Sequence, residues 1–114
     1  MNYDIYLVFV PFFKTEDGKE RPAVVFDING ETYATELLPV YSQKENHIKN
    51  ASYYDSFMYE ILDWQEAGLK KPSYINVSNI LEVDFKTMFK APRIGELSDR
   101  DVEGLLEKYN SYSD

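Results

Sequence analysis

The segment from Asp4 to Phe13 constrains the fold more than any other stretch of the sequence. It reads Asp-Ile-Tyr-Leu-Val-Phe-Val-Pro-Phe-Phe, an almost unbroken run of β-branched and aromatic residues. Such a run is typical of a strand that is buried on both faces. Proline cannot donate to a strand ladder, so Pro11 is expected to end the pairing. The sequence therefore predicts a β-dominated fold that begins with this strand.

Two further strands are predicted to form a hairpin. A charged loop at 14–20 leads to the second strand at 21–28, and the third strand is expected at 32–41. Between them, Asn29-Gly30 favours a type I′ turn, because both central positions of that turn need a positive φ.

The middle of the chain predicts short elements. Residues 44–56 are polar and are interpreted as a loop or a short irregular helix, 58–62 as a brief strand and 73–84 as one or two strands. Residues 63–68 predict one helical turn, with Asp63 as its N-cap, Glu66 reaching back and Gly68 just past its end.

One amphipathic helix is predicted to close the chain. Ser98 and Asp101 form a capping pair, and apolar residues recur at helical spacing from Val102 to Tyr109. Together the elements predict a mainly β (α+β) fold, a small and strongly bent antiparallel barrel with short helices and a C-terminal helix. The length of 114 residues predicts one domain, 1–114. The predicted core consists of Ile5, Leu7, Phe9, Val24, Phe26, Leu37, Ile75, Val77, Ile80, Val83, Leu105 and Leu106.

Composition excludes several kinds of site. The chain has no cysteine and one histidine, His47, which leaves no thiolate nucleophile and no pair of histidines for a transition metal. We therefore expect no metal and no cofactor. The net charge of −8 argues against a general nucleic-acid binder, although not against a compact site with a few basic groups. No signal-like N-terminus or membrane-length apolar run is present, so we expect a soluble, cytoplasmic protein.

Three sequence blocks, taken in order, resemble the PemK/MazF toxin family. They are Asp4-Ile-Tyr6 followed by Arg21-Pro-Ala-Val-Val25, then Asp63-Trp-Gln-Glu-Ala-Gly-Leu-Lys-Lys-Pro-Ser73, and finally Ile94-Gly-Glu-Leu-Ser-Asp99. The resemblance implies an SH3-like barrel that forms a homodimer. It also implies a metal-independent endoribonuclease that cleaves single-stranded RNA by attack of a 2′-hydroxyl on the phosphate, and that a cognate antitoxin neutralises. The family usually has glycine where this chain has Tyr3.

The resemblance implies three catalytic candidates. Arg21 stands at the family's arginine, and a guanidinium suits the task because it can hold two phosphate oxygens. Alignment on Pro39 and Gln43 puts Tyr41 at the family's threonine, with Ser42 beside it. Neighbouring strand residues face opposite sides, so Tyr41 and Ser42 are alternative sources of the hydroxyl.

Further residues are candidates for binding the substrate. Glu16 precedes Arg21 by five residues, a spacing that some relatives use for a functional glutamate. Lys14, Lys19, Phe12 and Phe13 flank the same loop and are candidates for holding and stacking on single-stranded RNA. Gln43, next to Ser42, is a further candidate for binding the substrate. The only basic region comprises Lys70, Lys71, Lys86, Lys90 and Arg93, and the sequence does not show whether it shares a face with Arg21.

Two other functions compete with RNA cleavage. A binding module on the same barrel, for a protein or a nucleic acid, would explain the altered threonine and glycine positions and the charge of −8. A toxin that binds a protein target such as gyrase is the third reading, since fold does not determine function.

Overall fold

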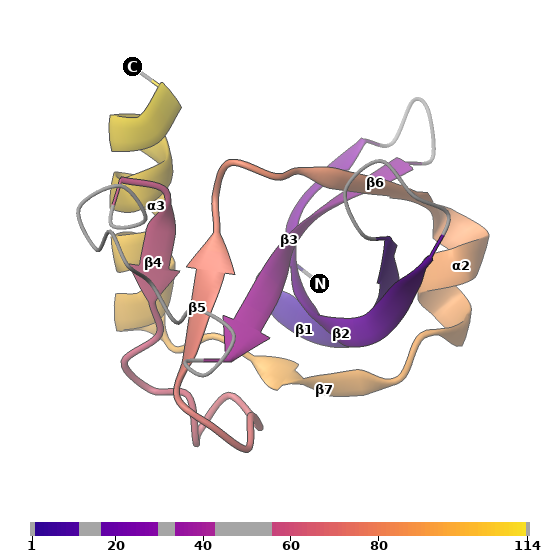
Figure 1. Ribbon diagram of the computed structural model, residues 1–114, viewed down its shortest axis with the longest axis horizontal. Helices are drawn as coiled ribbons and strands as arrows, with labels where there is room; N and C mark the ends of the chain where they lie inside the picture. Colours follow the sequence, from indigo (N-terminus) through magenta and orange to yellow (C-terminus); the bar gives the residue numbers. More distant parts are fainter. Residues whose placement is uncertain (1, 12–16, 30–33, 43–55, 114) are drawn as a thin grey trace.

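The computed structural model describes residues 2–11, 17–29, 34–42 and 56–113 (Figure 1). This part of the chain forms seven strands and two helices. The strands are β1 (Asp4–Pro11), β2 (Gly18–Asn29), β3 (Ala34–Ser42), β4 (Met58–Glu60), β5 (Ser73–Asn76), β6 (Leu81–Asp84) and β7 (Arg93–Glu96), and the helices are α2 (Phe85–Lys90) and α3 (Asp99–Ser113). The mainly β fold with a C-terminal helix is confirmed.

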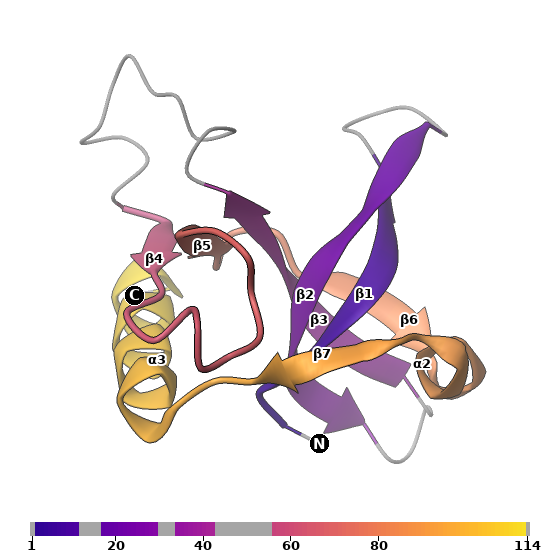
Figure 2. The same ribbon diagram turned by 90° about the horizontal axis from the view of Figure 1, so that it is seen from below.

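The strands form one strongly bent antiparallel sheet (Figure 2). Its order is β4-β5-β3-β2-β1-β7, and β6 pairs with β3 outside this path. The first half of β3 therefore pairs with β6 and its last residues pair with β5. The pairings among the described strands do not close into a ring, so the expected barrel is an open one.

The predicted boundaries hold well for some elements. β1 ends at Pro11, which pairs with Gly18, and 73–84 forms the two strands β5 and β6. α3 begins just after Ser98, whose Oγ accepts a hydrogen bond from the Asp101 amide at 3.3 Å. This contact confirms the predicted capping pair. α2 and β7 were not predicted.

The predicted two-residue turn is wrong in its register. β2 and β3 do pair, but Asn29 lies opposite Ala34, whereas a turn at Asn29-Gly30 would pair Ile28 with Glu31. The link between the strands thus comprises residues 30–33. Those residues, and most of the polar segment interpreted as a loop or short helix, lie outside the described residues.

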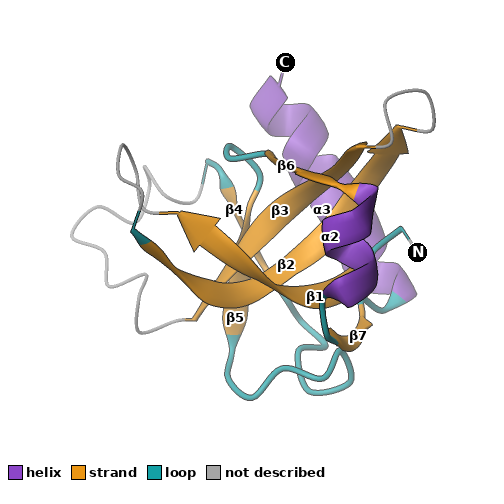
Figure 3. Ribbon diagram, turned by 90° about the vertical axis from the view of Figure 1, so that its right-hand side faces the viewer, coloured by secondary structure: helices purple, strands orange, loops and turns teal. Residues whose placement is uncertain are grey.

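Two hydrophobic clusters lie on opposite faces of the central strands. Neighbouring residues of β2 divide between them: Val24 belongs to the first cluster, while Ala23 and Val25 belong to the second. Leu105 of α3 packs in the first cluster and Met88 of α2 in the second. Figure 3 shows the two helices on opposite sides of the sheet. β1 is therefore buried on the face of Val8 and Val10, whereas its other face is buried at Ile5 and exposed at Phe9. The predicted burial on both faces is only partly correct.

The predicted core is only partly correct. Ile5, Val24, Leu37, Ile75, Val77 and Leu105 are buried. Leu7, Phe26, Val83 and Leu106 are half-buried. Phe9 and Ile80 are wrong, since they are 53% and 42% exposed. Ile80 lies in the connection between β5 and β6, and the cluster on the Ile5 face does not extend along β1 to Phe9.

Tyr3 occupies the position where the resemblance leads one to expect glycine. Its φ is +68°, in the left-handed region that favours glycine. The backbone is held there on both sides, because the Tyr3 amide donates to Val25 O at 2.6 Å and its carbonyl accepts from the Leu97 amide at 3.0 Å. The ring also packs against the first cluster. These contacts offset the strain that a non-glycine residue brings to this position.

Candidate functional site

A groove of about 440 Å³ opens beside the central strands. β1, β2 and β3 contribute its apolar floor through Leu7, Pro22 and Val40. Leu7 and Pro22 are direct partners across the β1–β2 pairing. The opposite wall comes from Leu69 and Ile94, which belong to the second and third family-like blocks. The groove thus brings together all three blocks that carry the resemblance.

Four cationic residues line this groove. Lys19 and Arg21 come from β2, and Lys70 and Lys71 come from the segment before β5. Glu20 is the acidic residue among the lining groups. The groove therefore carries an excess of positive charge on a protein whose net charge is −8, and it suits a polyanion.

The basic region of the sequence is divided by the fold. Lys70 and Lys71 join Arg21 at the groove, whereas Lys86 and Lys90 lie on α2. Arg93 lies 3.3 Å from Asp4 in an ion pair, and that contact raises the pKa of its guanidinium. Only tertiary structure shows this division.

Arg21 is stacked on a neighbouring aromatic ring. Its Cζ lies 4.3 Å from the centroid of the Tyr41 ring. A guanidinium over the face of a phenol is a cation–π contact, which stabilises the charge and fixes the plane of the group. The two residues that the resemblance places in the catalytic pair are therefore in contact, but through the ring of Tyr41.

Ser42 and Tyr41 contribute differently to the site. Ser42 lines the groove and lies opposite Ser73 in the pairing of β3 with β5. Ser73 lines it as well, and its Oγ donates to the Lys71 carbonyl at 2.8 Å. Because Tyr41 and Ser42 are consecutive in a strand, their side chains leave on opposite faces. Of the two, Ser42 is the one that lines the groove.

The remaining binding candidates fall into two groups. Lys19 lies at the groove, as described above. Lys14, Glu16 and Gln43 lie outside the described residues, as do Phe12, Phe13 and His47.

The wall that carries Lys70 and Lys71 is built by a tight turn. The Ala67 amide donates to Asp63 O at 3.0 Å, and Gly68 has a φ of +89°, which is the left-handed conformation expected of a residue that ends a helical turn. Gly95 of β7 packs against this turn, since a Cβ there would collide with the Ala67 carbonyl. The glycines of the second and third blocks therefore hold one wall of the groove together.

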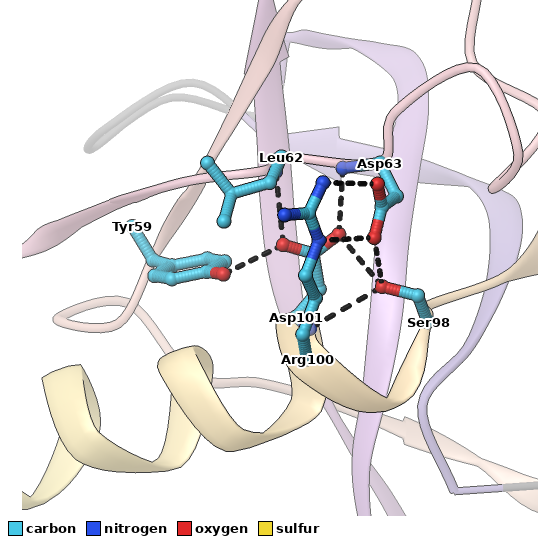
Figure 4. A network of polar contacts seen from close by, with 6 residues as sticks. All are labelled: Tyr59, Leu62, Asp63, Ser98, Arg100 and Asp101. Carbon is cyan, nitrogen blue, oxygen red and sulfur yellow. Dashed lines mark hydrogen bonds and ion pairs between the residues drawn. The ribbon is translucent and has the colours of Figure 1, made fainter.

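A polar network anchors the same turn to α3 (Figure 4). At its centre, Asp101 is fully buried. Its carboxylate accepts hydrogen bonds from Tyr59 Oη at 2.6 Å and from the Leu62 and Asp63 amides at 2.9 Å each. The sequence predicted Asp101 only as a helix cap. Gly104 is the one further signal, because a Cβ there would collide with the Tyr59 ring.

Asp63 forms the outer part of this network. Its carboxylate accepts from Arg100 Nε at 2.7 Å, Arg100 Nη2 at 2.6 Å and Ser98 Oγ at 2.6 Å. The contacts with Arg100 and Ser98 lower the pKa of Asp63 to about 2. Burial and the hydrogen bond to Asp101 raise the pKa of the Tyr59 phenol. These groups hydrogen-bond to one another, so their role is to stabilise the fold.

Two kinds of feature are absent from the described residues. No group of three or more acidic or histidine side chains is placed to hold a metal ion. No described helix has the length and apolar character needed to span a bilayer.

Comparison with known proteins agrees with the resemblance in the sequence. Residues 1–111 match the family model described as PemK-like, MazF-like toxin of type II toxin-antitoxin system. No curated protein matches the sequence.

Solved structures show the same fold at low sequence identity. MazF from Deinococcus radiodurans is 21% identical with a TM-score of 0.63, and the MazE–MazF structure from the same organism is 18% identical with a TM-score of 0.60. In both cases the match covers 96% of this chain and 91% of the other. Toxin MazF-mt6 of Mycobacterium tuberculosis is 16% identical with a TM-score of 0.60, over 96% of both chains.

Proposed function

The chain belongs to the PemK-like, MazF-like toxin family of type II toxin–antitoxin systems, and from that premise we propose that it is a metal-independent endoribonuclease that cleaves single-stranded RNA. The observation that carries the proposal is the groove, whose lining combines the cationic residues Arg21, Lys19, Lys70 and Lys71 with apolar residues of the central strands. Cations bind the phosphates of a single strand, and an apolar floor accommodates its bases.

The proposed reaction is an internal transfer at phosphorus. A ribose 2′-hydroxyl loses its proton and attacks the adjacent phosphorus, the bond to the 5′-oxygen breaks, and that oxygen takes up a proton. The products are a cyclic phosphate and a free 5′-hydroxyl. Negative charge builds on the phosphate oxygens in the transition state, where Arg21 supplies two parallel donors.

Two hydroxyls are candidates for a second contact with the phosphate. Ser42 is favoured because it lines the groove. Tyr41 is favoured instead as the group that orients Arg21, because its ring lies 4.3 Å beneath the guanidinium. In this arrangement Tyr41 stands at the family's threonine position, but its hydroxyl does not contact the phosphate.

We also propose the assembly in which this toxin acts. Family membership and the MazE–MazF structure among its neighbours support a cognate antitoxin as partner. A homodimer in the cytoplasm follows from the same premise, and light scattering that reports the mass of a single chain at tens of micromolar would contradict it.

A binding module without cleavage is the second candidate. The observation that favours it is the replacement of the family's threonine by Tyr41, whose phenol ring contacts the arginine. On this reading the groove binds a nucleic acid or protein segment and releases it intact.

One experiment separates the two candidates. The purified protein is incubated with a mixed RNA pool in EDTA, and new 5′-hydroxyl ends are mapped. We expect discrete cleavage sites that persist in the chelator. An uncut pool at high protein concentration would support the binding module.

A further inference from the structure

Phe9 is a half-exposed aromatic ring in the middle of a strand whose neighbours are buried. Val8 and Val10 are 5% and 3% exposed, whereas Phe9 is 53% exposed. The valines pack in the second cluster beneath α2. Phe9 therefore stands on the other face of β1, where its ring meets solvent.

That face is the one that forms the groove floor. Phe9 follows Leu7 by two residues, so their side chains leave β1 on the same face, about 7 Å apart. Leu7 pairs with Pro22, and Phe9 pairs with Glu20. Leu7, Pro22 and Glu20 all line the groove. Phe9 and Glu20 form the next pair on this face beyond Leu7 and Pro22, so the Phe9 ring extends the groove floor along β1.

The ring is held against the backbone of the neighbouring strand. A Cβ placed on Gly18 would come within 2.8 Å of Phe9 Cζ, and it would also collide with Val10 O. A side chain at position 18 would displace the ring. The absence of a side chain at Gly18 therefore leaves room for the Phe9 ring beside the groove.

Cationic groups line the groove that this surface extends. Lys70 and Lys71 come from the segment before β5, and Lys19 and Arg21 come from β2, where they pair with Val10 and Val8 on the face opposite to Phe9. Proteins that hold single strands combine cations that follow the backbone with aromatic rings on which bases stack. We propose that Phe9 is a stacking platform for one base of a single-stranded RNA whose phosphates lie in the cationic groove. The inference rests on the proposed function for its ligand class.

A fluorescence experiment tests the contact directly. The probe is a short 2′-O-methyl RNA, which binds but cannot be cut because its 2′-oxygens are blocked. Phe9→Trp places a reporter at the platform, and Phe89→Trp places one on α2, where the wild-type ring is 74% exposed. We expect the probe to quench Phe9→Trp and to leave Phe89→Trp at the background set by Trp64.

Binding affinity gives a second readout. Stacking on one base corresponds to a loss of about 5- to 150-fold in affinity when the ring is removed. We expect Phe9→Ala to fall in this range by fluorescence anisotropy and Phe9→Tyr to remain near wild type. Phe9→Leu should resemble Phe9→Ala, because a leucine keeps the apolar character but not the flat face. Phe89→Ala serves as the matched control and should be unchanged.

The outcomes distinguish this inference from the proposed function. If the wild-type protein binds the probe but never cuts RNA, and the probe quenches Phe9→Trp, the proposed cleavage is overturned and the stacking platform stands. Absent quenching together with full affinity of Phe9→Ala would overturn the platform while cleavage stands. A Phe9→Ala variant that binds RNA normally but changes its mass in light scattering would assign the ring to a contact with a second chain, which also overturns it.

Discussion

Two polar regions of this molecule differ in how their charges are used. In the network beneath α3, the Asp101 carboxylate is fully buried and accepts from Tyr59 and two backbone amides. In the groove, Lys19, Lys70 and Lys71 are exposed and line a cavity of about 440 Å³.

The difference separates charges that stabilise the fold from charges that face solvent in the groove. The buried Asp101 carboxylate accepts from Tyr59, Ser98 and two backbone amides, so it contributes to folding and is not accessible to a ligand. Cations on an open groove contribute little to folding, since solvent screens them. Variants of the network should therefore change stability, and variants of the groove should change binding or cleavage.

The largest expected effect is on stability, from Asp101→Ala. The change removes an acceptor from Tyr59 Oη and from the Leu62 and Asp63 amides, which leaves donors without their partner in the interior. We expect a loss of about 3–5 kcal/mol in the free energy of unfolding. Urea denaturation measures it, and Asp99→Ala, on the exposed first turn of the same helix, is the control. A loss no greater than that of the control would contradict the structural role.

Arg21→Lys tests the proposed role of the groove in cleavage. Lysine keeps the charge but has no fork to hold two oxygens, so we expect cleavage to fall by about 10²–10³ with stability unchanged. Arg93→Lys, at an exposed arginine that pairs with Asp4, controls for the substitution itself. Full activity of Arg21→Lys would show that the family's arginine role does not carry over to this chain.

Ser42→Ala and Tyr41→Phe separate the two candidate hydroxyls. We expect Ser42→Ala to lose about 10² in rate, as for the loss of a single donor, and Tyr41→Phe to stay near wild type because the ring remains. Tyr41→Leu removes the cation–π contact and should cost about 2- to 30-fold. The reverse pattern, with Tyr41→Phe inactive, would assign the hydroxyl to Tyr41, provided that its melting temperature is unchanged.

The charge of the groove can be measured through salt dependence. Each phosphate contact on a single strand contributes about 0.7 to the slope of log K against log salt. The double variant Lys70→Ala with Lys71→Ala should therefore lower the slope by about 1.4. The matched double variant at Lys86 and Lys90 on α2 should leave it unchanged. Equal changes in the slope for the two double variants would show that the RNA does not follow the groove.

The smallest effect belongs to the exposed edge of the network. The pKa of Asp63 lies at about 2 in the folded protein, below its ordinary value of 3.8. A lowered pKa stabilises the fold above the ordinary value, and this contribution is lost as the pH falls from about 4 to about 2. Melting temperatures of wild type and Asp63→Asn should therefore converge over that range. Parallel curves would contradict the contribution of the contact with Arg100.

Local patterns in the sequence were sufficient for much of the fold. The β-branched run from Asp4 predicted the first strand, and Pro11 predicted its end. Ser98 and Asp101 predicted the start of α3, and Gly68 the end of a helical turn. Each of these signals depends on the backbone conformation or pairing of a few adjacent residues, which the residues themselves largely determine.

The site depended on contacts between distant residues. Lys70 and Lys71 line the same groove as Arg21 because Gly95 lets the turn at 62–68 pack against β7, and Asp101 holds the same turn to α3. Phe9 is exposed, although its residue type predicts burial, because the apolar cluster on its face does not extend along β1 that far. Sequence patterns predicted the strands β1 to β6, and the family resemblance identified the arginine at position 21. Only tertiary structure decided which face of each strand is covered and which charges share a groove, because both depend on elements that pack from elsewhere in the chain.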